Sequence, residues 1–383
     1  MNILTDAFIS LFEVNMGIRS GERVVLFGDL IRPDETPSPA DADRRRRLLE
    51  VAAEAARFAA ERYGNAAFVS FPATAASGAE PPRELWQAVL GNTITDRLDA
   101  EGILPKLLVK QGSRDDLARA EAIVCAAREE VAAVVVALSN NSTSHTRFRA
   151  LVNAGGGRFA SLPNFDPEMF FTSMKVDWHS LADRTATVAR AVNSAREIVV
   201  SCPNGTRMRF GKEGREAQGD DGMLTMPGSF GNLPAGEVYL APREGTSSGV
   251  MVLEYAPTRK LASPLRLTVE EGNVTEIAGN EPYRVKLEQK FAESAANRNI
   301  AELGIGTNDR ATRPDNILEA EKILGTIHIA LGDNSGFGGT VSTPFHEDYI
   351  FYRPTLTAIM ADGSKRILLD DGIPSFMNQE REA

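Results

Sequence analysis

Cysteine and histidine are both scarce in this chain of 383 residues, which has two of the former and four of the latter. Two cysteines, Cys125 and Cys202, are too few for a disulfide framework or for a thiolate zinc site. Cys125 lies in an apolar run predicted to be helical, so we interpret it as a core residue. Basic residues are also in deficit. The formal net charge of −10 argues against a general affinity for nucleic acid or anionic membranes.

Long apolar runs are absent as well. No run approaches the roughly 20 residues that span a bilayer, and residues 1–6 lack the basic start of a secretory signal. An apolar fraction of 43% and a charged fraction of 25% are typical of a soluble globular protein. We therefore expect a cytoplasmic protein whose partners include neither membrane nor nucleic acid.

The length of the chain predicts two domains, with a boundary after residue 196. In the first domain, residues 1–196, short apolar runs alternate with longer helical runs. The predicted strands are 23–29, 66–71, 131–138 and 158–163, and the predicted helices are 40–63, 121–130 and 144–153. This alternation predicts an α/β domain with a mainly parallel sheet and helices on both faces. Four consecutive arginines at 44–47 are predicted to be the solvated start of a helix.

The pattern changes in the second domain, residues 197–383. Short runs with strand character are separated by turn dipeptides such as Asn204-Gly205 and Asp362-Gly363. The predicted strands are 198–200, 206–210, 237–242, 249–255, 265–269, 326–332, 347–352, 355–361 and 366–369. One helix, at 283–297, interrupts them. This half is therefore predicted to be an α+β domain with a mainly antiparallel sheet.

Half of the histidines lie 18 positions apart in this second domain, at His328 and His346. Asp348 follows His346 by two positions, so both side chains project from the same face of an extended strand. Convergent nitrogen and oxygen donors of this kind bind divalent metals. A glycine-rich loop at 332–339 follows the strand of His328 and can bring backbone close to a ligand. The sequence therefore predicts a metal site on this sheet.

Other residues are candidates to complete the site. Glu302 lies in an apolar strand, where an unpaired carboxylate costs on the order of several kcal/mol. Glu237 begins another strand, and Glu244 is its rival. Glu321 is a candidate general base. His145 is a candidate catalytic residue because it lies at a helix start after a strand, where α/β domains contact ligands.

Four ordered segments resemble the successive motifs of the metalloaminopeptidases called aminopeptidase T and aminopeptidase S. These segments are residues 232–239, 301–308, 321–332 and 346–348, and the resemblance covers roughly 130–373. It implies an N-terminal α/β domain, a C-terminal metal-bearing sheet domain, a homodimer and two divalent ions per chain (zinc, cobalt, manganese or magnesium). The residues that match the ligands of this family are Glu237, Glu302, His328, His346 and Asp348. Ser335 stands where the family has a tyrosine ligand, and the possible substitutes are Tyr349, Tyr352 or a water molecule.

The sequence is also similar to the 2,5-dihydroxypyridine dioxygenases, which hold a single iron(II) and cleave an aromatic ring. Two histidines and one carboxylate form a facial triad for iron, and His328, His346 and Asp348 match that set. Three hypotheses follow. The first is an aminopeptidase-type hydrolase of short peptides or small amides, and the alternative is a mononuclear iron(II) ring-cleaving dioxygenase with His145 as an acid or base. The third is a degenerate binding protein that a metal stabilises.

Overall fold

The computed structural model describes residues 4–257 and 259–375. The chain forms two compact units, Met1–Trp178 with Gly222–Pro234 and His179–Asp221 with Ala235–Ala383. The first is an α/β unit with a parallel sheet, and the second has antiparallel sheets, so the predicted fold classes are confirmed. The boundary predicted after residue 196 falls between helix α8 (Trp178–Asn193) and strand β5 (Glu197–Ser201).

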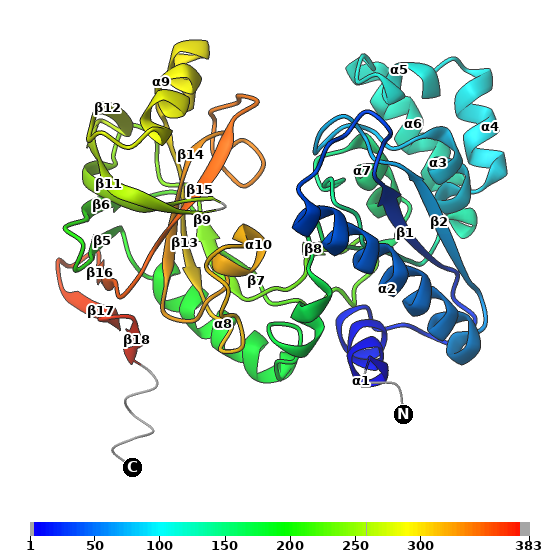
Figure 1. Cartoon of the computed structure of the whole chain (residues 1–383), viewed down its shortest axis with the longest axis horizontal. Coiled ribbons are helices and arrows are strands. Elements are labelled where there is room, and N and C mark those ends of the chain that lie inside the picture. The colour runs from blue at the N-terminus through cyan, green and yellow to red at the C-terminus, as the bar shows by residue number, and fades with distance from the viewer. Residues whose placement is uncertain (1–3, 258, 376–383) are drawn as a thin grey trace. The chain divides into compact units, whose positions relative to one another are not determined.

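The first unit is built on a five-stranded sheet with the order β2-β1-β3-β4-β8, and every neighbouring pair is parallel (Figure 1). Its strands are β1 (Val24–Leu30), β2 (Ala66–Pro72), β3 (Val134–Ala137), β4 (Arg158–Ser161) and β8 (Phe230–Asn232). The inner strands are buried on both faces, which explains their continuous apolar sequence.

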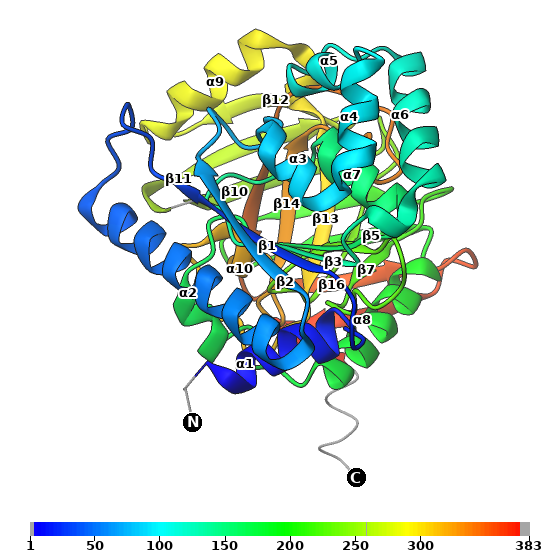
Figure 2. The same cartoon turned by 90° about the vertical axis from the view of Figure 1, so that its right-hand side faces the viewer.

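Helices cover this sheet on both faces (Figures 1 and 2). They are α1 (Thr5–Ile9), α2 (Pro39–Tyr63), α3 (Arg83–Leu90), α4 (Asn92–Ala100), α5 (Leu104–Leu108), α6 (Arg114–Ala126) and α7 (Arg147–Ala154), with a π-helix at Ser10–Asn15 and 3₁₀ turns at Arg128–Glu130 and Pro167–Phe171. Ser38 caps α2, because its hydroxyl accepts a hydrogen bond from the main-chain N–H of Asp41, and Pro39 pre-sets the first helical turn.

Two predictions for these helices are wrong. Cys125 is exposed and not in the core, because Ile123 and Val124 occupy the inward face of α6 and the next residue is turned about 100° away. Arg45 is buried rather than solvated, with a residue exposure of 4%. The arginines at 44–47 therefore do not form a uniformly hydrated helix start.

The second unit contains two antiparallel sheets. The eight-stranded sheet has the order β12-β11-β10-β6-β5-β16-β17-β18, and the five-stranded sheet, which we call the site sheet, has the order β15-β14-β13-β9-β7. The strands besides β5 are β6 (Arg207–Gly211), β7 (Gln218–Asp220), β9 (Glu237–Leu240), β10 (Ser248–Ala256), β11 (Arg259–Glu270), β12 (Asn273–Ala278), β13 (Ile300–Gly306), β14 (Ile327–Gly332), β15 (His346–Phe351), β16 (Thr355–Ile359), β17 (Lys365–Asp370) and β18 (Ile373–Pro374). The helices are α8, α9 (Tyr283–Glu293) and α10 (Ile317–Ala320), with a 3₁₀ turn at Ala295–Arg298.

The two sheets share one apolar core. Leu303, Ile305 and Ile329 of the site sheet belong to the same buried cluster as Phe210 and Leu267 of the larger sheet. Side chains alternate between the faces of a strand, so this packing occupies one face of the site sheet and leaves the other face for polar residues.

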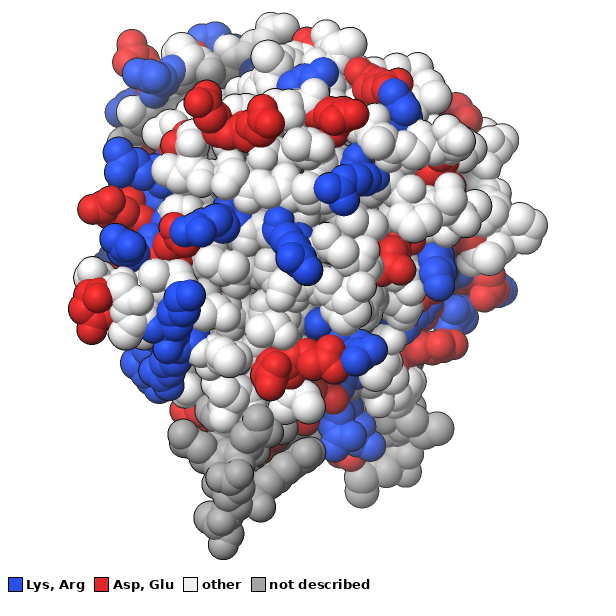
Figure 3. Space-filling model, turned by 90° about the vertical axis from the view of Figure 1, so that its left-hand side faces the viewer, with Lys and Arg blue, Asp and Glu red and all other residues white. Residues whose placement is uncertain are grey.

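The surface is mixed in charge. On the face shown in Figure 3, Lys and Arg side chains are interspersed with Asp and Glu side chains and separated by uncharged residues. This pattern differs from the continuous basic surface typical of nucleic-acid binding. None of the helices in the described part of the chain combines the length and apolarity needed to cross a lipid bilayer.

Candidate metal centre

One face of the site sheet collects the predicted ligands. Ala330 of β14 pairs with Glu302 of β13 on one side and with Asp348 of β15 on the other. His328 precedes Ala330 by two positions and shares its face, because directly paired residues and residues two apart point the same way. The register places the five predicted ligands together on this face: Glu237, Glu302, His328, His346 and Asp348.

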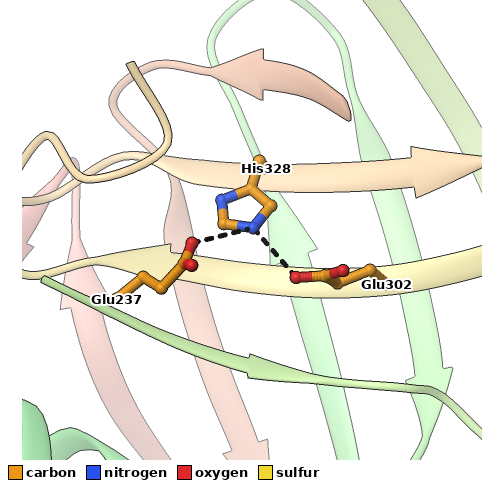
Figure 4. Close-up of side chains that lie close together, drawn as sticks. All are labelled: Glu237, Glu302 and His328. Carbon is orange, nitrogen blue, oxygen red and sulfur yellow. Dashed lines mark hydrogen bonds and ion pairs between the residues drawn. The ribbon is translucent and has the colours of Figure 1, made fainter. Parts of the chain in front are cut away.

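Glu237, Glu302 and His328 form a first donor group (Figure 4). The Nε2 atom of His328 lies 3.2 Å from Oε1 of Glu302 and 3.4 Å from Oε2 of Glu237. The imidazole lies across the backbone of Gly304, its partner on β13. A Cβ atom at Gly304 would lie 1.9 Å from His328 Nε2, so only glycine leaves room for the ring.

Glu302, His346 and Asp348 form a second donor group. The Nε2 atom of His346 lies 3.5 Å from Oε2 of Glu302 and 3.5 Å from Oδ2 of Asp348. The other nitrogen of His346, Nδ1, donates a hydrogen bond of 2.7 Å to the main-chain carbonyl of Asp333. That bond fixes the tautomer and directs Nε2 to the carboxylates. Glu302 belongs to both groups and joins the two histidines.

A buried ammonium group lies beside these carboxylates. Lys322 is 1% exposed, and its Nζ donates to Oε1 of Glu237 at 2.5 Å and to Oε2 of Glu321 at 3.1 Å. Lys322 therefore compensates part of the negative charge and leaves Oε2 of Glu237 facing His328.

Burial and charge act against each other on the ionisable groups. Burial alone would lower the pKa of His328, but the hydrogen bond to Glu302 and the charge of Glu237 raise it to about 9. Burial alone would raise the pKa of Asp348, but His346 holds it at about 2, and the two histidines lower the pKa of Glu302 in the same way. For Glu321, burial dominates and raises its pKa to about 8, although Lys322 opposes the shift.

The donor set fits a divalent metal ion. Oε2 of Glu237 and Oδ1 of Asp348 are buried without a hydrogen-bond partner, as is Nδ1 of His328. A buried carboxylate oxygen without a partner is costly. A cation bound among these oxygens and the two imidazole Nε2 atoms would remove that cost, and this mixture of donors suits iron, zinc and similar ions.

A cavity of about 490 Å³ opens beside the second donor group. Its wall contains His346, Asp348 and Glu321 together with the Tyr283 ring and Ile317. Two cations also line it: Lys286, which is paired with Glu347, and Arg259, which is paired with Glu281. The cavity can therefore admit a small molecule to the donors.

Other predicted candidates lie away from this cluster. Glu244 accepts hydrogen bonds from Asn334 and Thr340, so it holds the glycine-rich loop. The hydroxyl of Tyr349 bonds Tyr283 and Glu347, and its ring is in the core on the opposite face. The hydroxyl of Ser335 bonds the carboxylate of Asp333, and the Tyr352 ring packs on Tyr255. His145 lies in the first unit, in the loop before α7, and its catalytic role stays a prediction.

Two aromatic residues of the site were not singled out from the sequence. Tyr239 is paired with Gly304 and so lies on the ligand face. Phe337, from the glycine-rich loop, packs edge-on against both the Tyr239 ring and the imidazole of His346. The motif around Glu237 contained Tyr239, and its position two residues after Glu237 was the signal that could have identified it.

The chain is similar in sequence to a known family over most of this structure. The model of the 2,5-dihydroxypyridine 5,6-dioxygenase family (NicX) matches residues 100–367, which is more than half of the 383 residues. The chain belongs to this family. The matched region contains all five residues of the two donor groups as well as His145 and Glu321.

Two solved structures have the same fold. The 2,5-dihydroxypyridine dioxygenase from Pseudomonas putida KT2440 matches with a TM-score of 0.65 and 18% identity, over 97% of this chain and 96% of that one. Wild-type AmpT from Thermus thermophilus matches with a TM-score of 0.54 and 16% identity, over 96% and 98%. At these identities the likeness shows the fold alone. Both resemblances inferred from the sequence motifs are confirmed. No curated protein sequence matches the chain.

Proposed function

We propose that this protein is a mononuclear non-haem iron(II) dioxygenase that opens the ring of a hydroxylated, pyridine-like aromatic compound. The observation that carries the proposal is the pair of imidazoles on a ligand face beside a cavity, in a member of the dioxygenase family. This was the alternative hypothesis from the sequence. The family match favours it over the aminopeptidase hypothesis.

In this proposal, His328 from the first donor group and His346 and Asp348 from the second hold the iron between the two groups. Bound iron(II) supplies the redox chemistry that molecular oxygen needs in order to react with an aromatic ring. Glu302 lies against both imidazoles, 3.2 Å from His328 and 3.5 Å from His346. Glu302 either orients the two rings or replaces Asp348 as the carboxylate donor. The iron contents of the Glu302→Gln and Asp348→Asn variants distinguish these roles, because loss of the donor carboxylate should lower the iron content more.

The cavity supports binding of a flat ring and transfer of a proton. The Tyr283 ring and Ile317 offer apolar walls to an aromatic substrate. Glu321 lines the same cavity, and burial raises its pKa to about 8 when no metal is bound, so it is suited to exchange a proton with a substrate hydroxyl. We assign the general acid-base role to Glu321, and His145 is a second candidate for it.

One observation favours the two-metal hydrolase as a second candidate. The donors divide into two groups that share Glu302, as two neighbouring ions bridged by one carboxylate would require. Such a site would hold zinc, cobalt, manganese or magnesium and act on short peptides or small amides. The position of Lys322 weighs against it, because its ammonium already neutralises Glu237.

Metal content and oxygen uptake test the proposal. We expect about one iron ion per chain by mass spectrometry. We also expect oxygen consumption that depends on iron(II) and on 2,5-dihydroxypyridine or a related hydroxylated aromatic. About two zinc, cobalt or manganese ions per chain, with release of amino acids from short peptides, would support the hydrolase instead. Metal that only raises the melting temperature, without either activity, would support the degenerate binding protein.

We also propose, from the family resemblance, that the protein is a homodimer and that its partner in the reaction is a small molecule. From the sequence we propose that it acts in the cytoplasm. Light scattering on the purified protein tests the dimer, since it gives the mass of the particle against the chain mass of 41.4 kDa.

A further inference from the structure

A second cavity lies within the first unit, far along the sequence from the metal donors. Its volume is about 580 Å³, and it lies where β1 ends and α2 begins. The residues that line it are Asp29, Leu30, Ile31, Pro39, Ala42, Asp43, Arg45, Arg46 and Leu49. The proposed dioxygenase activity uses none of these residues.

The carboxyl end of β1, which lines this cavity, borders a reversal in the strand order of the parallel sheet. The chain passes from β1 to β2 on one side and places β3 on the other side of β1, so the strand order reverses between β1 and β3. Asp29 at the carboxyl end of β1 accepts hydrogen bonds from the main-chain N–H groups of Asn140, at 2.6 Å, and Asn141, at 3.0 Å. Those residues follow β3. Open α/β sheets bind ligands outside the carboxyl ends of the strands at such a reversal.

Arg45 has unused hydrogen-bonding capacity in the wall of this cavity. Its guanidinium is paired with Glu35 through Nη1, whereas Nε and Nη2 are shielded from solvent and have no hydrogen-bond partner. Neighbouring arginines differ: Arg46 is paired with Asp43, and Arg44 donates to Asp41. Buried guanidinium nitrogens without acceptors are costly, and a carboxylate is the acceptor that matches their planar geometry.

The other residues that line the cavity indicate which ligand would fit it. Leu30 is 40% exposed and Ile31 is 37% exposed, and both line the cavity with Leu49. Apolar side chains that remain this open beside a cavity favour a ligand with an apolar body. Asp29 and Asp43 would repel a polyanion, and the segment between β1 and α2 has no glycine-rich phosphate loop.

We infer that this cavity is a binding site for a small monocarboxylate with an apolar body, whose carboxylate accepts hydrogen bonds from Arg45 once the guanidinium turns Nε and Nη2 toward the cavity. The site belongs to the first unit alone, so it does not depend on the identity of the metal or on the proposed reaction.

Calorimetric titration of the full-length protein with benzoate, nicotinate and hexanoate tests the inference, with benzamide as the uncharged counterpart of benzoate. The expected result is that at least one carboxylate binds and that benzamide binds at least tenfold more weakly than benzoate. Ala42→Phe, which fills the cavity from α2, and Arg45→Gln should each weaken carboxylate binding at least tenfold. Ala53→Phe is the matched control, because it is about three turns further along the same side of α2 and outside the cavity.

Repeating the titration with His346→Ala separates this site from the metal centre. Retained carboxylate binding supports the inference even if the proposed reaction is wrong. Four results would each overturn the inference. Two concern the variants: loss of binding in His346→Ala, or binding to Ala42→Phe as tight as to the wild type. Two concern the ligands: equal affinity for benzamide and benzoate, or no binding of any of the three carboxylates. Circular dichroism of Arg45→Gln identifies a folding failure, and in that case Ala42→Phe decides the result.

Discussion

Replacing Gly304 with alanine should disable the metal centre by a purely steric effect. The added Cβ would lie 1.9 Å from both Cε1 and Nε2 of His328, where real Cβ atoms have no contacts. The strand cannot move away easily, because β13 is paired on both sides, with β14 and with β9. The imidazole must therefore leave its position between Glu237 and Glu302.

The size of the effect follows from overpacking and from the loss of a donor. Forcing one extra carbon into a packed site costs about 1–3 kcal/mol. For a unit of this size, that corresponds to a fall in melting temperature of roughly 3–10 °C. Mutating a residue that only hydrogen-bonds to a metal ligand typically weakens metal affinity by roughly 10- to 100-fold. Displacing a ligand itself should weaken it by at least as much. Turnover should fall at least in proportion.

The assay combines metal content, melting temperature and oxygen uptake for Gly304→Ala. Gly336→Ala is the matched control, because Gly336 lies in the neighbouring loop and a Cβ there meets nothing within 4 Å. A double-mutant cycle with His328→Ala isolates the clash, since alanine at 304 should cost little once the imidazole is gone. Normal metal content and turnover in Gly304→Ala would refute the position of His328 and its role as a ligand.

Three further predictions concern the charged groups. In metal-free protein, Lys322→Met should destabilise the fold by about 3–5 kcal/mol, because it leaves the Glu237 carboxylate without its lysine in the interior; an unchanged urea midpoint would contradict the buried ion pair. Glu321→Gln should keep the metal content but lower kcat by about 10²–10⁴-fold, and a kcat equal to that of the wild type would remove Glu321 from the mechanism. The stability of metal-free protein should fall between pH 6.5 and 9, because the raised pKa values of His328, about 9, and Glu321, about 8, favour the folded state only while these groups remain protonated. Urea unfolding with a chelator at pH 6.5 and pH 9 measures this loss, on the order of 3 kcal/mol, and a stability that rises over this range would contradict the arrangement.

Much of the site follows from the periodicity of the sequence. Alternation in β15 places His346 and Asp348 on one face, and the apolar positions of β13 and β14 identify their core-facing sides. The alternation of strands and helices likewise predicts the parallel sheet of the first unit. These inferences succeed because they depend on neighbours within one strand or on the order of elements, which the sequence records directly.

Helical packing was harder to predict. The short helices α3, α4 and α5 were not predicted, because isolated helices of this length are marginal and form here by burying residues such as Leu85, Trp86 and Ile94 in the core of the first unit. The exposure of Cys125 and the burial of Arg45 were also missed. In both cases the local composition predicts the helix, but the rotation of the helix against its neighbours decides which side chain is buried.

By itself, the sequence determined the sheet type of both units and the residue types able to bind a metal, because these depend on composition and on periods of two or about 3.6 residues. Only the tertiary structure decided that Gly304 lies beneath His328, that Glu302 joins both histidines, and that Lys322 neutralises Glu237. Those relations depend on the register between strands and on contacts between distant segments. No single strand encodes them, since a shift of one residue would turn every ligand to the other face.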